Sequence, residues 1–433
     1  MDRIFAIVFF IVSASVVSAQ ENRIDIIRHD APELAHFGEH TIGVRTLDIV
    51  DENRIDVVNT PNGSDNVVYD RKLTIEVWYP ADPKSIQMEG EAYKAITRNP
   101  AITATLHGRA IRNASPLSND ARYPLVIISH GYPGNRYLMS HLGENLASKG
   151  YVVASIDHTD STYDDQQAFS STLYNRPLDQ RFVIDNIASL SEDSNSFLNG
   201  LVDANKTGVV GYSMGGYGLV NNLGGGYNDT IAAAGAISPN ALVSAHSTGH
   251  PEYRNNLDSR IKAGFAIAPW GMNAGFWTAD DLAGINVPAF YLAGDADKVA
   301  GYENGVRAIF IGAVNSDRYL LTFKNAGHSA GAPYPLPIEI LNNDDKTGAS
   351  HYTDPVWDTV RMNNIMDHFA TAYFNLYLKG EQQNERYLDV ITDGADGVYS
   401  ENKGVKDDDH TYWNGFDRGT AVGLKLEHLQ RGQ

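Results

Sequence analysis

Six short apolar runs, separated by stretches with helical periodicity, constrain the fold of this chain more than any other feature of its sequence. They cover residues 124–129, 151–156, 207–212, 263–268, 287–293 and 318–323. Most are apolar throughout, as is typical of strands covered on both faces. Helical patterns cover residues 137–148, 177–190, 214–223, 302–314 and 356–378, and Pro177 is expected in the first turn of its helix. This alternation predicts an α/β fold: a mostly parallel central sheet with helices on both faces.

Two further strand candidates, residues 41–50 and 72–79, precede the alternation. The turn-rich segment between them predicts an antiparallel N-terminal strand pair at the edge of the sheet. The Gly-rich and then polar segment 224–260 is expected to be an insertion over the carboxyl edge of the sheet. We therefore predict a single domain over residues 20–433, with edge strands at 40–80, a core at 120–380, the insertion at 224–260 and a C-terminal tail at 381–433.

The charge balance limits the partners that the chain can bind. It has 53 acidic and 34 basic residues among 433, which gives a net charge of -19. A surface this acidic repels phosphate backbones and anionic lipids, so a nucleic-acid partner is not expected. The sequence leaves the oligomeric state open.

The first 19 residues have the pattern of a signal peptide. Arg3 is followed by an apolar run over residues 4–12 and by the small residues Val17-Ser18-Ala19. Cleavage near Ala19 would make the protein secreted or periplasmic, with no integral membrane segment after processing; an uncleaved N-terminal anchor is the alternative. The chain has no cysteine, which excludes a disulfide, a thiolate nucleophile and a Cys-based metal site. No cofactor or metal is expected.

The segment Gly211-Tyr212-Ser213-Met214-Gly215-Gly216 directly follows an apolar run and begins a helical pattern. A G-x-S-x-G sequence between a strand and a helix is typical of a nucleophile elbow, which exposes a serine in strained backbone geometry. A second G-x-S-x-G sequence surrounds Ser329, but the prolines that follow it forbid a helix. We therefore predict Ser213 as a nucleophile and Ser329 as a bystander.

A serine hydroxyl is a weak nucleophile until a histidine, oriented by a carboxylate, accepts its proton. The downstream candidates are His328, His351, His368, His410 and His428. His328 is preferred because it lies in a Gly-flanked loop just after the apolar run 318–323. Asp295 and Asp297 compete for the acid, in the loop after the run 287–293. Asp297 is preferred because it lies farther into the loop, whereas Asp295 is better placed to cap the turn.

The run 124–129 ends in Ser129-His130-Gly131-Tyr132-Pro133-Gly134, a candidate oxyanion loop. The amide of Tyr132 is the expected donor, because Pro133 has no N–H. The amide of Met214, at a helix N-terminus, is the second expected donor. Trp270 ends another strand and is expected to form a flat substrate-binding wall, with core packing as the alternative. The acidic cluster at 157–165 could hold a cation, but its irregular spacing favours a solvated loop.

These residues resemble α/β-hydrolases of the dienelactone hydrolase-like and platelet-activating-factor acetylhydrolase-like group. The similarity is carried by Ile42-Gly43-Val44-Arg45, Val77-Trp78-Tyr79-Pro80, Ser129-His130-Gly131, residues 176–183 and Trp413-Asn414-Gly415-Phe416. The oxyanion turn, Ala268-Pro269-Trp270 and the Asp297 loop are also similar to secreted cutinase-like polyesterases. The resemblance implies an α/β-hydrolase fold, a triad of Ser213, Asp297 and His328, and an oxyanion hole formed by the amides of Tyr132 and Met214.

Two features depart from the resembled families. Mammalian-type acetylhydrolases take their acid from the strand before Ala268-Pro269-Trp270, where this chain has no aspartate. Tyr212 also replaces the histidine that is common before the nucleophile.

The expected function is an exported serine hydrolase that cleaves carboxylic esters of lipid-like or aromatic acids through an acyl-enzyme. The substrate would be a small-molecule or a polymeric ester. The alternatives are a polyester hydrolase of the cutinase or PET type, an acyltransferase that uses the same acyl-enzyme, and a binding scaffold without catalysis. The last alternative expects broken catalytic positions, whereas all three candidate residues are present.

Overall fold

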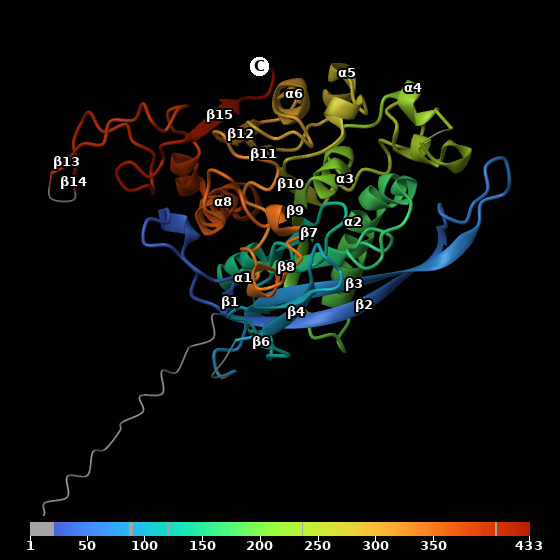
Figure 1. Ribbon diagram of the computed structural model, residues 1–433, viewed down its shortest axis with the longest axis horizontal. Coiled ribbons are helices and arrows are strands. Elements are labelled where there is room, and N and C mark those ends of the chain that lie inside the picture. Colours follow the sequence, from blue (N-terminus) through green and yellow to red (C-terminus); the bar gives the residue numbers. More distant parts are fainter. Residues whose placement is uncertain (1–20, 86–89, 119–120, 236, 403–404) are drawn as a thin grey trace, which may run out of the picture.

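A ten-stranded sheet forms the centre of the protein in the computed structural model, which describes residues 21–433 except 86–89, 119–120, 236 and 403–404 (Figure 1). The strand order is β15-β12-β11-β10-β9-β7-β8-β3-β2-β6. Six consecutive neighbours are parallel: β12 (Arg318–Phe323), β11 (Ala289–Gly294), β10 (Ile261–Ile267), β9 (Val202–Tyr212), β7 (Tyr123–Ser129) and β8 (Val152–Asp157). These are the six predicted apolar runs, and β7, β11 and β12 are buried along their whole length. The predicted signal peptide lies outside the described residues.

Helices cover both faces of this sheet. Figure 1 shows α1 (Ser140–Ser148) and α8 (Thr359–Phe374) on one side of the strands, and α2 (Phe169–Glu192), α3 (Met214–Asn222) and α6 (Arg307–Gly312) on the other. Short helical segments complete the connections: α4 (Asp229–Ala232), α5 (Ala279–Leu282), α7 (Ile338–Leu341), η1 (Glu33–Ala35), η2 (Pro239–His246), η3 (Met272–Ala274), η4 (Tyr302–Val306), η5 (Ala349–His351), η6 (Asn375–Lys379) and η7 (Gln382–Tyr387). None of the helices in the described ranges combines the length and the apolar character needed to cross a bilayer.

Antiparallel strands lie at both edges of the sheet. β2 (Thr41–Ile55) and β3 (Val68–Ala81) pair as predicted, with the short β6 (Ile111–Arg112) outside them. β15 (Leu424–Leu429) pairs with β12 at the opposite edge. The sequence analysis did not predict β15, although its Leu-Lys-Leu-Glu alternation is the pattern of a half-exposed edge strand.

A second, smaller sheet packs against the hydrophobic core through Tyr93, Ala95, Ala104 and Leu106, and it was also not predicted. It contains β1 (Asn22–Arg23), β5 (Thr103–His107) and β4 (Ala92–Ile96). β4 and β5 form an antiparallel hairpin, and its turn begins directly after Ile96. A further short pair, β13 (Glu401–Asn402) and β14 (Val405–Lys406), lies in the C-terminal segment.

Helix α2 corrects one expectation. It begins at Phe169, so Pro177 lies inside the helix and not in its first turn. A proline there cannot donate to the carbonyl of Leu173, but the hydroxyl of Tyr217 donates to that oxygen at 2.8 Å. Asn222 donates from α3 to the carbonyl of Pro177 at 3.0 Å. These bonds from α3 compensate for the interior proline, and they fix α2 against the helix that follows Ser213.

Candidate active site

Ser213 lies at the sharp turn between β9, which ends at Tyr212, and α3, which begins at Met214. Its φ of 52° and ψ of -110° lie in a region that is strained for a residue with a side chain. A Cβ atom on Gly211 would lie 2.3 Å from the carbonyl oxygen of Gly215, and one on Gly215 would lie 1.9 Å from that of Ser129. Both positions therefore require glycine, and the local geometry is that of a nucleophile elbow.

His328 joins Ser213 to Asp297 through hydrogen bonds. Its Nε2 lies 3.0 Å from the Ser213 Oγ, and its Nδ1 lies 2.8 Å from the Asp297 Oδ2. The three residues follow β9, β11 and β12, parallel strands whose carboxyl ends meet at one edge of the sheet. The second oxygen of Asp297 accepts the N–H groups of Val299 at 2.7 Å and Ala300 at 3.1 Å. The loop itself therefore fixes the orientation of the carboxylate.

Asp295 makes a different contact. Its carboxylate accepts the N–H of Asn325 and ties the loop after β11 to the loop after β12. Among the described residues, its bonds do not include His328. The geometry thus brings Asp297, and not Asp295, to His328, and the role of Asp297 as the acid stays a prediction.

The turn after β7 packs closely against Ser213. The Cβ position of Gly131 lies 3.3 Å from the Cβ of Ser213. Among the described residues, the amide N–H groups of Tyr132 and Met214 have no hydrogen-bond acceptor. Both amides are therefore free to donate to a substrate oxygen, which is the requirement for an oxyanion hole.

Arg176, on α2, is hydrogen-bonded to the backbone of this turn. Its guanidinium is buried and donates to the carbonyl of Gly131 at 3.3 Å, and also to the carbonyl of His130 and the hydroxyl of Ser161. Burial lowers the pKa of Arg176 to about 9. The sequence analysis used this residue only for family resemblance and missed its contact with the oxyanion turn.

A second serine–histidine–aspartate array lies beneath the same turn. His158 contacts the Ser129 Oγ at 2.8 Å and the Asp179 carboxylate at 3.0 Å. All three side chains are at most 1% exposed, so no substrate can reach Ser129. Asp179 also accepts the Arg71 guanidinium at 2.8 Å. This buried array stabilises the turn. Its hydrogen-bond geometry resembles that of a triad, but it is not a reactive site because substrate cannot reach it.

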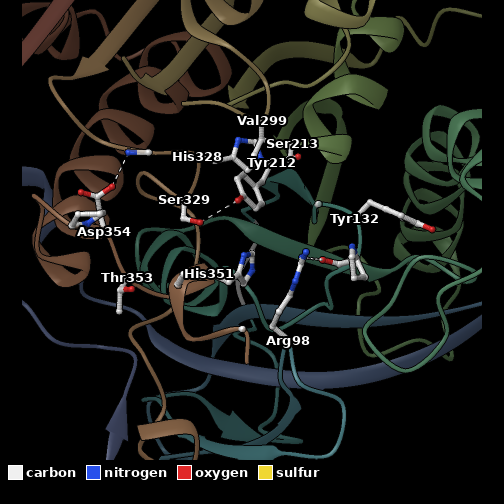
Figure 2. Close-up of a pocket in the computed structure, with 16 residues that line it drawn as sticks. Arg98, Tyr132, Tyr212, Ser213, Val299, His328, Ser329, His351, Thr353 and Asp354 are labelled. Carbon is white, nitrogen blue, oxygen red and sulfur yellow. Dashed lines mark hydrogen bonds between the residues drawn. The ribbon is translucent and has the colours of Figure 1, made fainter. Parts of the chain in front are cut away.

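A cavity of about 340 Å³ opens above Ser213 (Figure 2). The elbow, His328 and the oxyanion turn form its base. Arg98, His351 and Asp354 contribute to its wall from loops outside the parallel strands. Ser329 also faces the cavity, 3.5 Å from the Tyr212 hydroxyl, but no helix follows it until α7. Ser329 therefore does not lie on an elbow.

Trp270 lines a neighbouring cavity of about 630 Å³ and is not part of the wall around Ser213. This second cavity is mostly apolar, with Leu173, Ile231, Ile237 and Phe276 among its lining residues. The ring of Phe169 lies between the two sites, with its centroid 5.1 Å from that of Tyr132 and 5.4 Å from that of Trp270. Phe169 begins α2, whose early start was not predicted. A substrate-binding role for Trp270 stays a prediction, and it would now operate through the second cavity.

Carboxylates of the acidic cluster after β8 are bonded to arginines of the same chain. Asp157 accepts the N–H of Arg136 at 2.6 Å, and Asp160 pairs with Arg71 at 3.0 Å. Within the described part of the chain, no group of three or more histidine or acidic side chains is arranged to hold a metal ion.

The chain is similar in sequence to several known proteins. A sequence profile of the family described as "PETase: PET hydrolase-like" matches residues 108–248. The chain is 26% identical over 209 residues to "Cutinase est1" of Thermobifida alba, which covers 48% of this chain and 54% of that protein. It is 27% identical over 147 residues to the platelet-activating factor acetylhydrolase of Cavia porcellus, covering 25% of this chain and 34% of that protein. The chain thus spans about half of the first relative and about a third of the second.

A solved structure extends the comparison to most of the chain. The ferulic acid esterase of Streptomyces cinnamoneus superimposes with a TM-score of 0.55 at 22% identity, and the match covers 81% of this chain and 94% of the esterase. The predicted fold and the predicted similarity to cutinases and acetylhydrolases are confirmed. The chain has the α/β-hydrolase fold, and its central part is similar to PET hydrolase-like proteins.

Proposed function

We propose that this protein is an exported serine hydrolase of carboxylic esters. The observation that carries the proposal is the position of His328, which bridges Ser213 and Asp297 at the base of an accessible cavity. The relatives named cutinase and platelet-activating factor acetylhydrolase support the same reaction class.

The reaction begins when the Ser213 Oγ attacks the ester carbonyl and His328 accepts its proton at Nε2. Asp297 orients the imidazole and stabilises its positive charge. The amides of Tyr132 and Met214 donate to the oxyanion of the tetrahedral intermediate. His328 then protonates the departing alcohol, which leaves the acyl group on Ser213. A water molecule, deprotonated by His328, releases the acid and restores the serine.

Polyester hydrolysis is a second candidate, favoured by the PET hydrolase-like profile. The chain is also 24% identical over 213 residues to the bis(hydroxyethyl) terephthalate hydrolase of Streptomyces coelicolor. The second cavity, next to Trp270, offers an apolar surface for an aromatic or alkyl part of either kind of substrate.

A panel of 4-nitrophenyl esters from acetyl to palmitoyl, with an aromatic polyester film alongside, tests both candidates. The proposal expects release of 4-nitrophenol from at least part of the panel, and soluble aromatic acid from the film only if the polyester candidate holds. No turnover of any ester by the folded protein would contradict the proposed function.

We also propose export of a single-domain protein processed near Ala19. Small residues at 17–19 support this position of cleavage. Mass spectrometry of secreted protein is expected to find an N-terminus near Gln20, whereas secreted protein that retains Met1 would contradict the proposal.

A further inference from the structure

Arg98 extends to the cavity above Ser213 from the β4–β5 turn, outside the central sheet. Its backbone N–H donates to the hydroxyl of Tyr352 at 2.8 Å. The Cβ position of Gly348 lies 2.7 Å from the Cβ of Arg98. Two segments outside the parallel strands, the β4–β5 turn and the loop before α8, are thus joined at this residue. Figure 2 shows the Arg98 side chain beside His351.

The guanidinium of Arg98 has no acidic partner among the described residues. Within the described ranges its side chain makes one hydrogen bond, from Nη1 to the carbonyl oxygen of Pro133 at 3.4 Å, and no ion pair with a carboxylate. Some other arginines of this acidic protein form ion pairs, for example Arg71 with Asp179 and Arg136 with Asp157, and others, such as Arg176, are buried among backbone carbonyls. Five N–H groups in a planar fork are therefore largely available at the wall of the cavity.

The nearby carboxylates are occupied elsewhere. Asp354 lines the same cavity, but its oxygens accept the N–H groups of Gly327 at 2.7 Å, Val356 at 2.8 Å and Trp357 at 2.9 Å. On the adjacent loop, Asp345 accepts the side chain of Asn99 at 3.0 Å. Both carboxylates keep their negative charge, but among the described residues neither forms an ion pair with Arg98, so the Arg98 guanidinium stays available to a carboxylate of a substrate.

The positive charge of Arg98 affects the pKa of His351, which lines the same cavity. Burial, followed by the positive charge of Arg98, lowers the pKa of His351 to about 3. His351 is consequently neutral at pH 7, and its Nε2 is bonded to the Tyr163 hydroxyl at 2.9 Å. Arg98 is thus a cation that the wall of the cavity presents to a substrate, beside the neutral His351.

We propose that the cavity accepts esters that also carry a carboxylate, such as half-esters of aromatic dicarboxylic acids, and that Arg98 binds this carboxylate. The inference rests on the proposed ester hydrolysis and adds a substrate class to it. A net charge of -19 repels an anionic substrate at long range, so its binding requires a local cation. The planar guanidinium matches a carboxylate with two parallel hydrogen bonds.

Three groups of methyl benzoates test the proposal: one with a carboxylate at ring position 3 or 4, one with an uncharged methyl group there, and one with a phosphonate. The wild-type kcat/KM is expected to be at least about tenfold higher for a carboxylate ester than for its methyl analogue. This ratio should fall toward one in about 1 M NaCl, because salt screens the charge pair.

Variants of Arg98 separate recognition from chemistry. In Arg98→Gln the ratio of the two kcat/KM values is expected to fall to about one, mainly because KM for the carboxylate ester rises. In Arg98→Lys the ratio should be intermediate, because the positive charge remains but the planar guanidinium is lost. The matched control is Arg122→Gln, an exposed arginine paired with Glu192, which should keep the wild-type ratio.

The outcomes distinguish the two proposals. Absence of any hydrolysis by the wild-type protein would contradict the proposed function. Hydrolysis of the uncharged esters without a preference for the carboxylate, or a preference that survives in Arg98→Gln, would overturn the inference alone. Preference for the phosphonate over the carboxylate would also overturn it, because the site would then select a different anion.

Discussion

Two aspartates only two positions apart have different roles, because their carboxylates point to different hydrogen-bond donors. Asp297 is buried, receives His328 on one oxygen and loop amides on the other, and is fixed before any substrate binds. Asp295 is exposed and receives the backbone of Asn325. In the proposed reaction the first contact orients a base, whereas the second contact ties together two loops.

Replacing each aspartate by asparagine tests this division. Asp297→Asn is expected to lower kcat on the order of 10⁴-fold with the fold intact, because an amide can hold the imidazole in the wrong tautomer and cannot stabilise its positive charge. Asp295→Asn should cost about 1 kcal/mol of stability and little activity, because it weakens only the tie between the loops. A crippled Asp295→Asn enzyme beside a nearly normal Asp297→Asn enzyme would overturn the assignment.

At the scale of single elements, helix α2 supports the oxyanion turn. Arg176 binds the carbonyls of His130 and Gly131, and Asp179, one turn later, binds the Arg71 and His158 side chains beneath them. These charged groups are buried, so each depends on its partners for solvation. The helix thereby fixes the position of the Tyr132 amide relative to Ser213.

Arg176→Gln tests Arg176 as a positioning residue. Loss of the guanidinium frees two carbonyls and allows the turn to move, so kcat should fall up to about 10²-fold while KM changes little, because the amide acts on the oxyanion and not on the bound ester. Arg176→Lys should recover part of kcat. Arg181→Gln, on the same helix but bonded to the carbonyl of Asn256, is the control and should keep kcat. An equal loss in the control would indicate a general effect of α2 on folding.

The sequence predicted the elements whose patterns are local. The six parallel strands are short apolar runs, and the elbow is a contiguous motif whose glycines are demanded by contacts below 2.5 Å. It did not predict the start of α2 at Phe169, because Pro177 gave a strong local signal for a later start and the compensating bonds come from α3. The place of the Trp270 side chain depends on the same unpredicted start of α2, because the Phe169 ring packs against the rings of both Trp270 and Tyr132. Arg98 was missed because its position depends on contacts between the β4–β5 turn and a distant loop.

At the scale of the whole molecule, the core contains several neutral histidines. Burial lowers the pKa of His158 to about 3, that of His246 to about 4 and that of His368 to about 3. The unfolded chain binds protons at these sites below a pKa of about 6.5, whereas the folded protein does not. Stability is therefore complete above this pH and is lost as the pH falls toward 4.

Urea unfolding at pH 7 and pH 5 measures this loss. Each such histidine should lower the free energy of unfolding by about 1.4 kcal/mol per pH unit below pH 6.5. In His368→Gln the free energy of unfolding should depend less steeply on pH, by the contribution of about one proton, because the unfolded variant no longer binds a proton at this position. Equal stability of the wild-type protein at both pH values would contradict the account of a neutral buried histidine core.

The central claim is that Ser213, and not the second G-x-S-x-G serine, carries the acyl group. The most direct measurement compares kcat for a 4-nitrophenyl ester in Ser213→Ala and Ser329→Ala, with circular dichroism as the check on folding. In Ser213→Ala, kcat should fall on the order of 10⁶-fold, because among the described residues no other hydroxyl is bonded to His328. Ser329→Ala should keep most of the wild-type kcat. Near-wild-type turnover in a folded Ser213→Ala protein would contradict the account.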